Sequence, residues 1–321
     1  MKIVIPGGSG QVGTLLARAF VADGHEVVVF SRQPTPAPWR TVCWDGRSVG
    51  AWTSEIEGAD VVINLAGRSV NCRYTARNRR LILESRLQST RAVGEAIAQA
   101  ACPPRLWLQA STATIYAHRY DAANDETTGI LGGGEPDAPS TWRFSIDVAR
   151  AWEEAAQAID LTHTRLVLMR SAMTMSPDAG GIFAVLLGLV RHGMGGTCGD
   201  GRQYVSWIHD RDFLRAIYWL IEHAELMGPI NLASPNPVPN AEFMRTLRRV
   251  WGTRIGLPAT RWMLEVGAFL LRTESELILK SRRVVPGRLL ESGFTFEFPI
   301  WQAAAEDLCR RVRQGTEKPL A

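Results

Sequence analysis

Lysine is scarce in this chain of 321 residues. Only Lys2, Lys280 and Lys318 stand among its 36 basic residues, so the long stretch between positions 2 and 280 contains none. A reaction that needs a lysine ammonium within that stretch is therefore excluded. Arginine carries almost all of the positive charge, and because a guanidinium stays protonated it can bind an anion but cannot donate a proton.

Paired cysteines and long apolar runs are also missing. The five cysteines are scattered and odd in number, with no Cys-x-x-Cys pair, which predicts neither a disulfide framework nor a metal site. No apolar stretch reaches the roughly 18 residues that a membrane span needs. The first residues already read as a strand and a glycine-rich turn, so we expect no signal peptide. These absences predict a cytoplasmic protein without a metal or membrane partner.

Arginines gather between positions 68 and 91, where seven of them occur. One interpretation is a solvated helix face, and the other is a positively charged rim of a site that binds a ligand phosphate. Aromatic residues do not interleave with these arginines as they do on a nucleic-acid platform. We therefore expect no nucleic-acid partner.

A glycine-rich turn follows the first apolar run, residues 3–5, and a helical pattern begins directly after it. Gly7 allows a tight turn, Gly10 lets a pyrophosphate approach the backbone, and Gly13 lets the helix pack on the strand. The first turn of that helix presents free N–H groups and the positive end of its dipole. The pattern predicts a nucleotide cofactor bound by Gly7, Gly8, Ser9, Gly10, Gln11, Val12 and Gly13.

Apolar strand patterns alternate with helical patterns through the first half of the chain. Because the strands are continuously apolar, the pattern predicts an α/β fold, a Rossmann-type doubly wound parallel sheet with a smaller C-terminal substrate cover. We expect a cofactor-binding domain over residues 1–170 and a substrate-cover region over 171–259, which includes a last sheet strand near 230–233. A C-terminal helical module follows over 260–321, with an aromatic, strand-like run at 294–298.

The end of the second predicted strand bears on the choice of cofactor. NAD-binding sheets usually place a carboxylate there, whereas this strand ends in Ser31 and Arg32. A hydroxyl and a guanidinium suit a 2′-phosphate and favour NADP(H). Alternatively, the guanidinium stacks on the adenine ring, which needs no 2′-phosphate. Other strand ends add further candidate cofactor contacts, namely Trp44, Asp45, Asn64, Leu65, Ala66, Gly67, Ala110, Ser111 and Arg170.

Several longer motifs resemble the extended short-chain dehydrogenase/reductase superfamily, in a nucleoside-diphosphate-sugar-epimerase-like branch. They are the glycine turn, the Ser31-Arg32 pair and the segments 64–67, 84–86, 150–153, 201–210, 233–243 and 290–299. The last of these resembles a C-terminal module of unassigned function. The resemblance implies a Rossmann fold, a nicotinamide cofactor and, by default, a nucleotide-sugar substrate.

The resemblance also implies a catalytic tyrosine with a lysine four residues later, and this chain lacks that pair. Alignment on Glu153 puts Ser145 at the tyrosine position and Ala149 at the lysine position. Thr112 stands where the family has its carbonyl-polarising Ser or Thr. Tyr116, or Tyr74 or His209 from the cover region, is the candidate substitute for the missing acid.

Two functions stay open at this point. The chain is either an NADP(H)-binding oxidoreductase or epimerase-like enzyme for a small carbonyl or nucleotide-sugar-like substrate, or a non-catalytic NADP(H) sensor or partner-binding protein. Arg86 is expected over the nicotinamide end of the cofactor, unless it forms a structural ion pair with Glu84 or a neighbour. The long helix expected over residues 76–100 could also pair two copies into a homodimer.

Overall fold

The computed structural model describes residues 1–135, 139, 142–259 and 276–316 of the chain. Its centre is a seven-stranded sheet, in which every neighbouring pair of strands is parallel. In spatial order its strands are β10 (Gly228–Leu232), β6 (Arg165–Ser171), β5 (Leu106–Thr112), β4 (Val61–Asn64), β1 (Lys2–Pro6), β2 (Glu26–Ser31) and β3 (Arg40–Cys43). This confirms the predicted doubly wound α/β fold.

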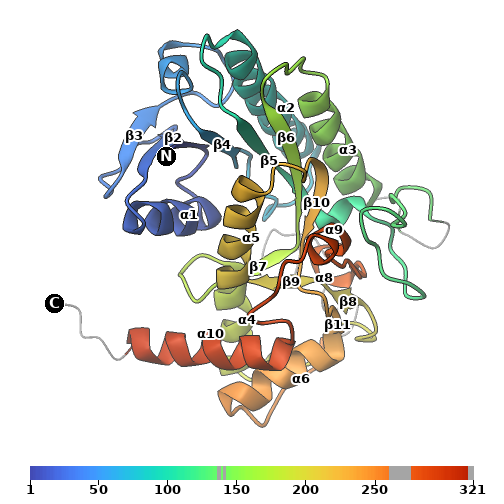
Figure 1. The fold of residues 1–321 in the computed structure, drawn as a ribbon. Coiled ribbons are helices and arrows are strands. Elements are labelled where there is room, and N and C mark those ends of the chain that lie inside the picture. Colours follow the sequence, from blue (N-terminus) through green and yellow to red (C-terminus); the bar gives the residue numbers. More distant parts are fainter. Residues whose placement is uncertain (136–138, 140–141, 260–275, 317–321) are drawn as a thin grey trace.

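Helices cover both faces of this sheet (Figure 1). Helices α1 (Gln11–Ala22) and α5 (Asp210–Glu222) share one apolar core with the sheet, and α2 (Ala76–Gln99) and α3 (Arg143–Gln157) lie on the opposite core. The central strands β1 and β4 are buried almost throughout, which explains why their sequences are apolar without alternation. No helix within the described ranges is both long and apolar enough to cross a membrane.

A second, smaller apolar core lies beyond the carboxyl end of β6. It is formed around Trp207 and Trp301, and helices from distant parts of the sequence contribute to it. The elements of this region are β7 (Met173–Met175), α4 (Ile182–Arg191), β8 (Tyr204–Val205), β9 (Trp207–His209), β11 (Val238–Pro239), α6 (Asn240–Trp251) and α10 (Trp301–Thr316). Helix α10 lies along α6 (Figure 1), so α10 packs on the cover region.

The remaining described helices are short. They are the 3₁₀ helices η1 (Ala51–Glu55) and η2 (Ala113–Ile115) and the helices α8 (Glu276–Leu279) and α9 (Gly287–Glu291). Residues 260–275 and 317–321 of the expected C-terminal module lie outside the described residues.

The prediction of a strand-like run at 294–298 is wrong. These residues pair with no strand, and the Asp212 carboxylate at the start of α5 binds their backbone instead. Its two oxygens accept from the N–H groups of Glu297 at 2.7 Å and Phe298 at 2.8 Å. A buried carboxylate thus satisfies the donors that a neighbouring strand would otherwise bind.

We expect Asp212→Ala to loosen the C-terminal part of the chain. The substitution leaves two backbone N–H groups without their acceptor and removes a partner of Arg215, at a cost of about 2–4 kcal/mol. Denaturant unfolding measures this loss. Glu297→Ala is the matched control, because its pair with Arg211 is exposed and should cost less than about 1 kcal/mol. Equal effects of the two substitutions would contradict this account.

Candidate cofactor and active site

The glycine turn between β1 and α1 contains glycines of two kinds. Gly7 has a φ of +74°, and a Cβ there would stand 2.6 Å from the Ala66 Cα. A Cβ on Gly13 would stand 2.4 Å from the Gly8 Cα. These two glycines are needed for packing within the chain. Gly10 is different, because a Cβ there would meet its nearest neighbour only at 3.9 Å.

Helix α1 starts at this turn with an uncovered N-terminus. Its N-cap residue Gly10 has no side chain to accept from the helix, and the first turn contains no acidic residue. The first N–H groups and the positive end of the dipole therefore stay available for an anion. The open space at Gly10 lies at the same point, so the turn is shaped for a phosphate that approaches the backbone.

A cleft of about 800 Å³ opens beside the turn and follows the carboxyl ends of β1 to β4. Ten of the predicted cofactor residues line it, namely Gly7, Ser9, Gly10, Ser31, Arg32, Trp44, Asp45, Leu65, Ala66 and Gly67. In a parallel sheet all these strand ends meet at one edge, which is where such folds bind ligands. The cleft is large enough for a dinucleotide-sized ligand to lie along it.

Ser31 and Arg32 form the end of the cleft at β2. The Ser31 hydroxyl is buried and lies 3.3 Å from the Ser9 hydroxyl, which ties this strand end to the glycine turn. The Arg32 side chain is exposed, and no hydrogen bond or ion pair to another described residue engages its guanidinium. An exposed guanidinium at the rim of a cleft, without an internal acceptor, is available for a ligand anion.

Trp44 and Asp45 lie after β3, and both side chains also make contacts within the protein. The Trp44 ring packs against those of Phe30 and Trp52, with centroids 5.7 and 5.3 Å away. Asp45 Oδ1 accepts from the backbone N–H groups of Arg47 and Ser48, which lowers the pKa of Asp45 although its partial desolvation opposes the shift. The carboxylate therefore shapes its own turn besides bordering the cleft.

Other predicted cofactor residues support the cleft from behind or beside it. Asn64 is fully buried, and its Oδ1 accepts from the Ala66 N–H at 3.1 Å while its Nδ2 donates to Gln109. Gly8, Val12 and Gly13 do not line the cleft. Gln11 borders a smaller adjoining hollow, and among the described residues its Nε2 has no hydrogen-bond partner.

Helix α2 supplies cleft residues that the sequence analysis missed. Leu81, Glu84, Ser85 and Gln88 all border the cleft. Their spacing of three and four residues puts them on one face of a helix, and that spacing was the available signal. Phe30, Gln33, Gly46, Arg47 and Arg68 complete the lining, and each adjoins a predicted residue in the sequence or follows one closely.

Arg170 at the end of β6 belongs to a buried hydrogen-bond network and does not border the cleft. Its guanidinium makes a two-point ion pair with Glu153 of α3, at 2.8 and 2.7 Å. Ser111 donates to the same carboxylate, and Arg170 also donates to the Tyr116 hydroxyl at 3.0 Å. The arrangement holds β5, β6 and α3 together, and it argues against direct cofactor contacts for Arg170 and Ser111.

Tyr116 is the next residue in that hydrogen-bond network and is 2% exposed. Its hydroxyl accepts from Arg170 and donates to Asn231 Oδ1 at 3.0 Å, so its usual hydrogen-bonding capacity is filled. Burial raises the pKa of this phenol, although Arg170 acts in the opposite direction. This placement argues against Tyr116 as the substitute for the missing acid.

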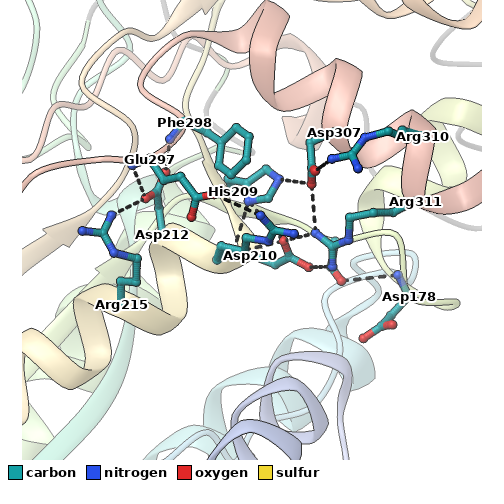
Figure 2. Close-up of polar contacts among 12 residues, drawn as sticks. Asp178, His209, Asp210, Asp212, Arg215, Glu297, Phe298, Asp307, Arg310 and Arg311 are labelled. Carbon is teal, nitrogen blue, oxygen red and sulfur yellow. Dashed lines mark hydrogen bonds and ion pairs between the residues drawn. The ribbon is translucent and has the colours of Figure 1, made fainter.

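His209 is also enclosed, in the cluster of charged residues that Figure 2 shows. Its Nδ1 accepts from the Arg211 N–H at the start of α5, and its Nε2 lies 3.2 Å from Asp307. The ring stacks on Phe298 at 3.9 Å and is fully buried, which lowers the pKa of His209 although Asp210 and Asp307 oppose this. These contacts give His209 a structural part in joining α5 to α10.

Thr112 and Arg86 do not line the cleft. Thr112 is half-buried at the end of β5, and its hydroxyl accepts from the Thr114 N–H at 3.2 Å. Arg86 donates to the carbonyls of Arg68 and Ile82 and lies over the Trp152 ring, so it forms no ion pair with Glu84. Ala110 is half-buried within β5, and the described part of the chain contains no metal-ligand cluster.

The chain is similar to known proteins over nearly its whole length. Residues 3–233 match the model of the NAD dependent epimerase/dehydratase family, and residues 259–308 match a domain of unknown function, DUF1731. Among curated relatives, bovine "Epimerase family protein SDR39U1" is 32% identical, over 96% of this chain and 99% of the relative. YfhF of Bacillus subtilis, also called an epimerase family protein, is 31% identical over 96% and 98% of the two chains.

Two solved structures are also similar to this one. The human epimerase family protein SDR39U1, crystallised with NADPH, has a TM-score of 0.83 and 28% identity over 97% of this chain and 99% of its own. A nucleoside-diphosphate sugar epimerase from Corynebacterium glutamicum has a TM-score of 0.75 and 28% identity, over 97% of this chain and 58% of its own. With the matched fold, glycine turn and family model, the chain belongs to the NAD dependent epimerase/dehydratase family.

Proposed function

We propose that this chain is an NADP(H)-dependent oxidoreductase with an epimerase-like fold, acting on a small carbonyl or nucleotide-sugar-like substrate. The observation that carries the cofactor choice is the exposed guanidinium of Arg32 beside Ser31. No carboxylate stands at this end of β2 to hold a ribose 2′-hydroxyl, whereas a guanidinium suits a 2′-phosphate. The human relative crystallised with NADPH supports the same choice.

The rest of the cleft fits a dinucleotide. The uncapped start of α1 and the open space at Gly10 would hold the pyrophosphate, and Leu65 to Gly67 would border the central riboses. A bound dihydronicotinamide would supply hydride to the substrate. Thr112 would bind the carbonyl oxygen of the substrate, in keeping with its place at the end of β5.

A non-catalytic NADP(H)-binding protein is the second candidate. It is favoured by the two residues on α3, Ser145 and Ala149, that stand where relatives of this superfamily would have tyrosine and lysine. Incubation of the purified chain with NADPH and a panel of aldehydes, ketones and nucleotide sugars separates the two. Consumption of NADPH with any member supports the oxidoreductase, and tight NADPH binding without turnover supports the second candidate.

We expect Arg32→Ala to remove the preference for NADPH. Calorimetric titration of the wild type should give an NADPH affinity at least about tenfold above that for NADH, or roughly 1.4 kcal/mol, and the variant should bind both alike. Arg143→Ala removes an exposed arginine on α3, outside the cleft, and should change neither affinity. Equal binding of the two nucleotides by the wild type would contradict the 2′-phosphate site.

Two glycine substitutions should separate binding from folding. Gly10→Ala adds a Cβ where the chain leaves room, so the melting temperature should stay near that of the wild type while NADPH affinity falls about tenfold or more. Gly13→Ala forces a Cβ against Gly8 and should destabilise the fold by about 1–3 kcal/mol. Thermal unfolding and calorimetric titration measure both effects, and unchanged affinity in Gly10→Ala would exclude a close phosphate at this turn.

A further inference from the structure

The positions vacated by the tyrosine and lysine on α3 are both contacted by one later stretch of the chain, residues 276–284, called here the returning segment. The Ser145 hydroxyl donates to Glu276 Oε2 at 2.7 Å. Ala149 shares a small buried apolar cluster with Val284. The short side chains on α3 therefore leave space that the returning segment occupies.

The returning segment brings Lys280, the one lysine between positions 2 and 318, into the protein interior. Its side chain is 1% exposed, and its Nζ donates to the Thr114 carbonyl at 2.8 Å. Thr114 follows Thr112 by two residues and donates its N–H to the Thr112 hydroxyl. The ammonium is thus bonded to the same strand-end turn that holds the expected carbonyl-binding group.

The environment of Lys280 is densely charged. Arg282 donates to the Thr114 hydroxyl at 3.1 Å, and Glu276 and Glu135 supply negative charge nearby. His118 faces the same group and accepts from the Ser281 N–H at 2.7 Å. Burial, together with the charge of Arg282, lowers the pKa of Lys280 to about 8, although the two carboxylates oppose this. A lysine in that range can exchange a proton close to neutral pH.

The hydrogen bonds of this ammonium are incomplete within the described residues. Lysine has three N–H donors, and in the part of the chain that the structure describes the Thr114 carbonyl is the one acceptor for Nζ. Leaving donors of a buried charge unfilled is costly. The unfilled capacity is suited to the oxygen of a ligand.

We propose that Lys280 binds the carbonyl oxygen of the substrate and donates the proton that the missing tyrosine would donate. This inference rests on the proposed reductase function and on a reduced nicotinamide as the hydride source. Hydride adds to the carbonyl carbon, the carbonyl π electrons move to oxygen, and that oxygen takes a proton from the ammonium. The cofactor is left oxidised, the substrate becomes an alcohol, and the neutral amine recovers its proton from water. Glu276 acts as a positioning residue that ties the returning segment to Ser145.

The small number of lysines makes the ionisation of Lys280 directly measurable. With isotope-labelled lysine, the full chain should give three side-chain signals by NMR, and Lys280→Arg and Lys2→Arg assign them. We expect the Lys280 signal to titrate near pH 8 and to move when the carbonyl substrate identified by the panel is added with NADP⁺. A signal that titrates near the ordinary lysine value of about 10.4, or that ignores the ligands, would overturn the proposal.

Steady-state kinetics as a function of pH also tests Lys280. Because the ammonium is the reactive form, wild-type kcat for carbonyl reduction should fall as the pH rises through about 8. In Lys280→Arg this fall should disappear and kcat should drop about 100-fold or more, with the NADPH Kd within about twofold of wild type. Lys280→Met should show the same loss, and Lys2→Arg should keep the wild-type profile.

The outcomes separate this proposal from the function on which it rests. If both Lys280 variants keep kcat within about threefold of wild type, with the wild-type pH profile, Lys280 is not the proton donor. The proposed reductase function is then unaffected. A wild type that binds NADPH but reduces no carbonyl ends both proposals. Unchanged NADPH affinity in the variants shows that they are folded, so a selective loss of kcat supports the proposal.

Discussion

The ion pair between Asp210 and Arg311 is the interaction on which the placement of the C-terminal part of the chain depends. Both Asp210 oxygens accept from the guanidinium at 2.8 Å, and the carboxylate is almost fully buried (Figure 2). Asp307 joins Arg311 and Arg310 to His209 in the same cluster. A buried carboxylate without its partners is costly. Helix α10, which supplies Arg311, is therefore held in its position on the start of α5.

That attachment has consequences at the edge of the sheet where the carboxyl ends of the strands meet. Asp212, two residues further along α5, binds the backbone at 297 and 298, and Arg215 donates to the Thr295 carbonyl. With its far end held, the chain between 276 and 291 runs past β10 and the turn after β5. The region matched by the domain of unknown function thereby contributes side chains beside Thr114 and Ser145, where the family's catalytic pair is missing.

The sequence was informative wherever the structure depends on neighbouring residues. The glycine turn, the apolar strands and the Ser31-Arg32 strand end are local patterns, and parallel strand ends necessarily meet at one edge. The doubly wound sheet and most of the cleft lining could therefore be predicted. The cleft face of α2 could also have been predicted from its spacing of three and four residues.

The remaining features depend on contacts between distant positions, which a single sequence does not show. Arg170 pairs with Glu153 and Tyr116 bonds to Asn231, and no motif in the sequence indicates that these residues meet. The aromatic run at 294–298 alternates like a strand, yet a carboxylate more than 80 residues earlier takes its N–H groups. Lys280 stood out only by rarity, and its place beside Thr114 follows from the path of the returning segment.

The most direct test of this account is a crystal structure of the full chain with NADPH bound. We expect the nicotinamide ring to lie beside Thr112, with its hydride-bearing carbon and Lys280 Nζ on the border of one hollow. That hollow should allow a single carbonyl group to sit roughly 3–3.5 Å from each. A nicotinamide separated from Lys280 by packed side chains, or a cofactor outside the cleft at the glycine turn, would contradict it.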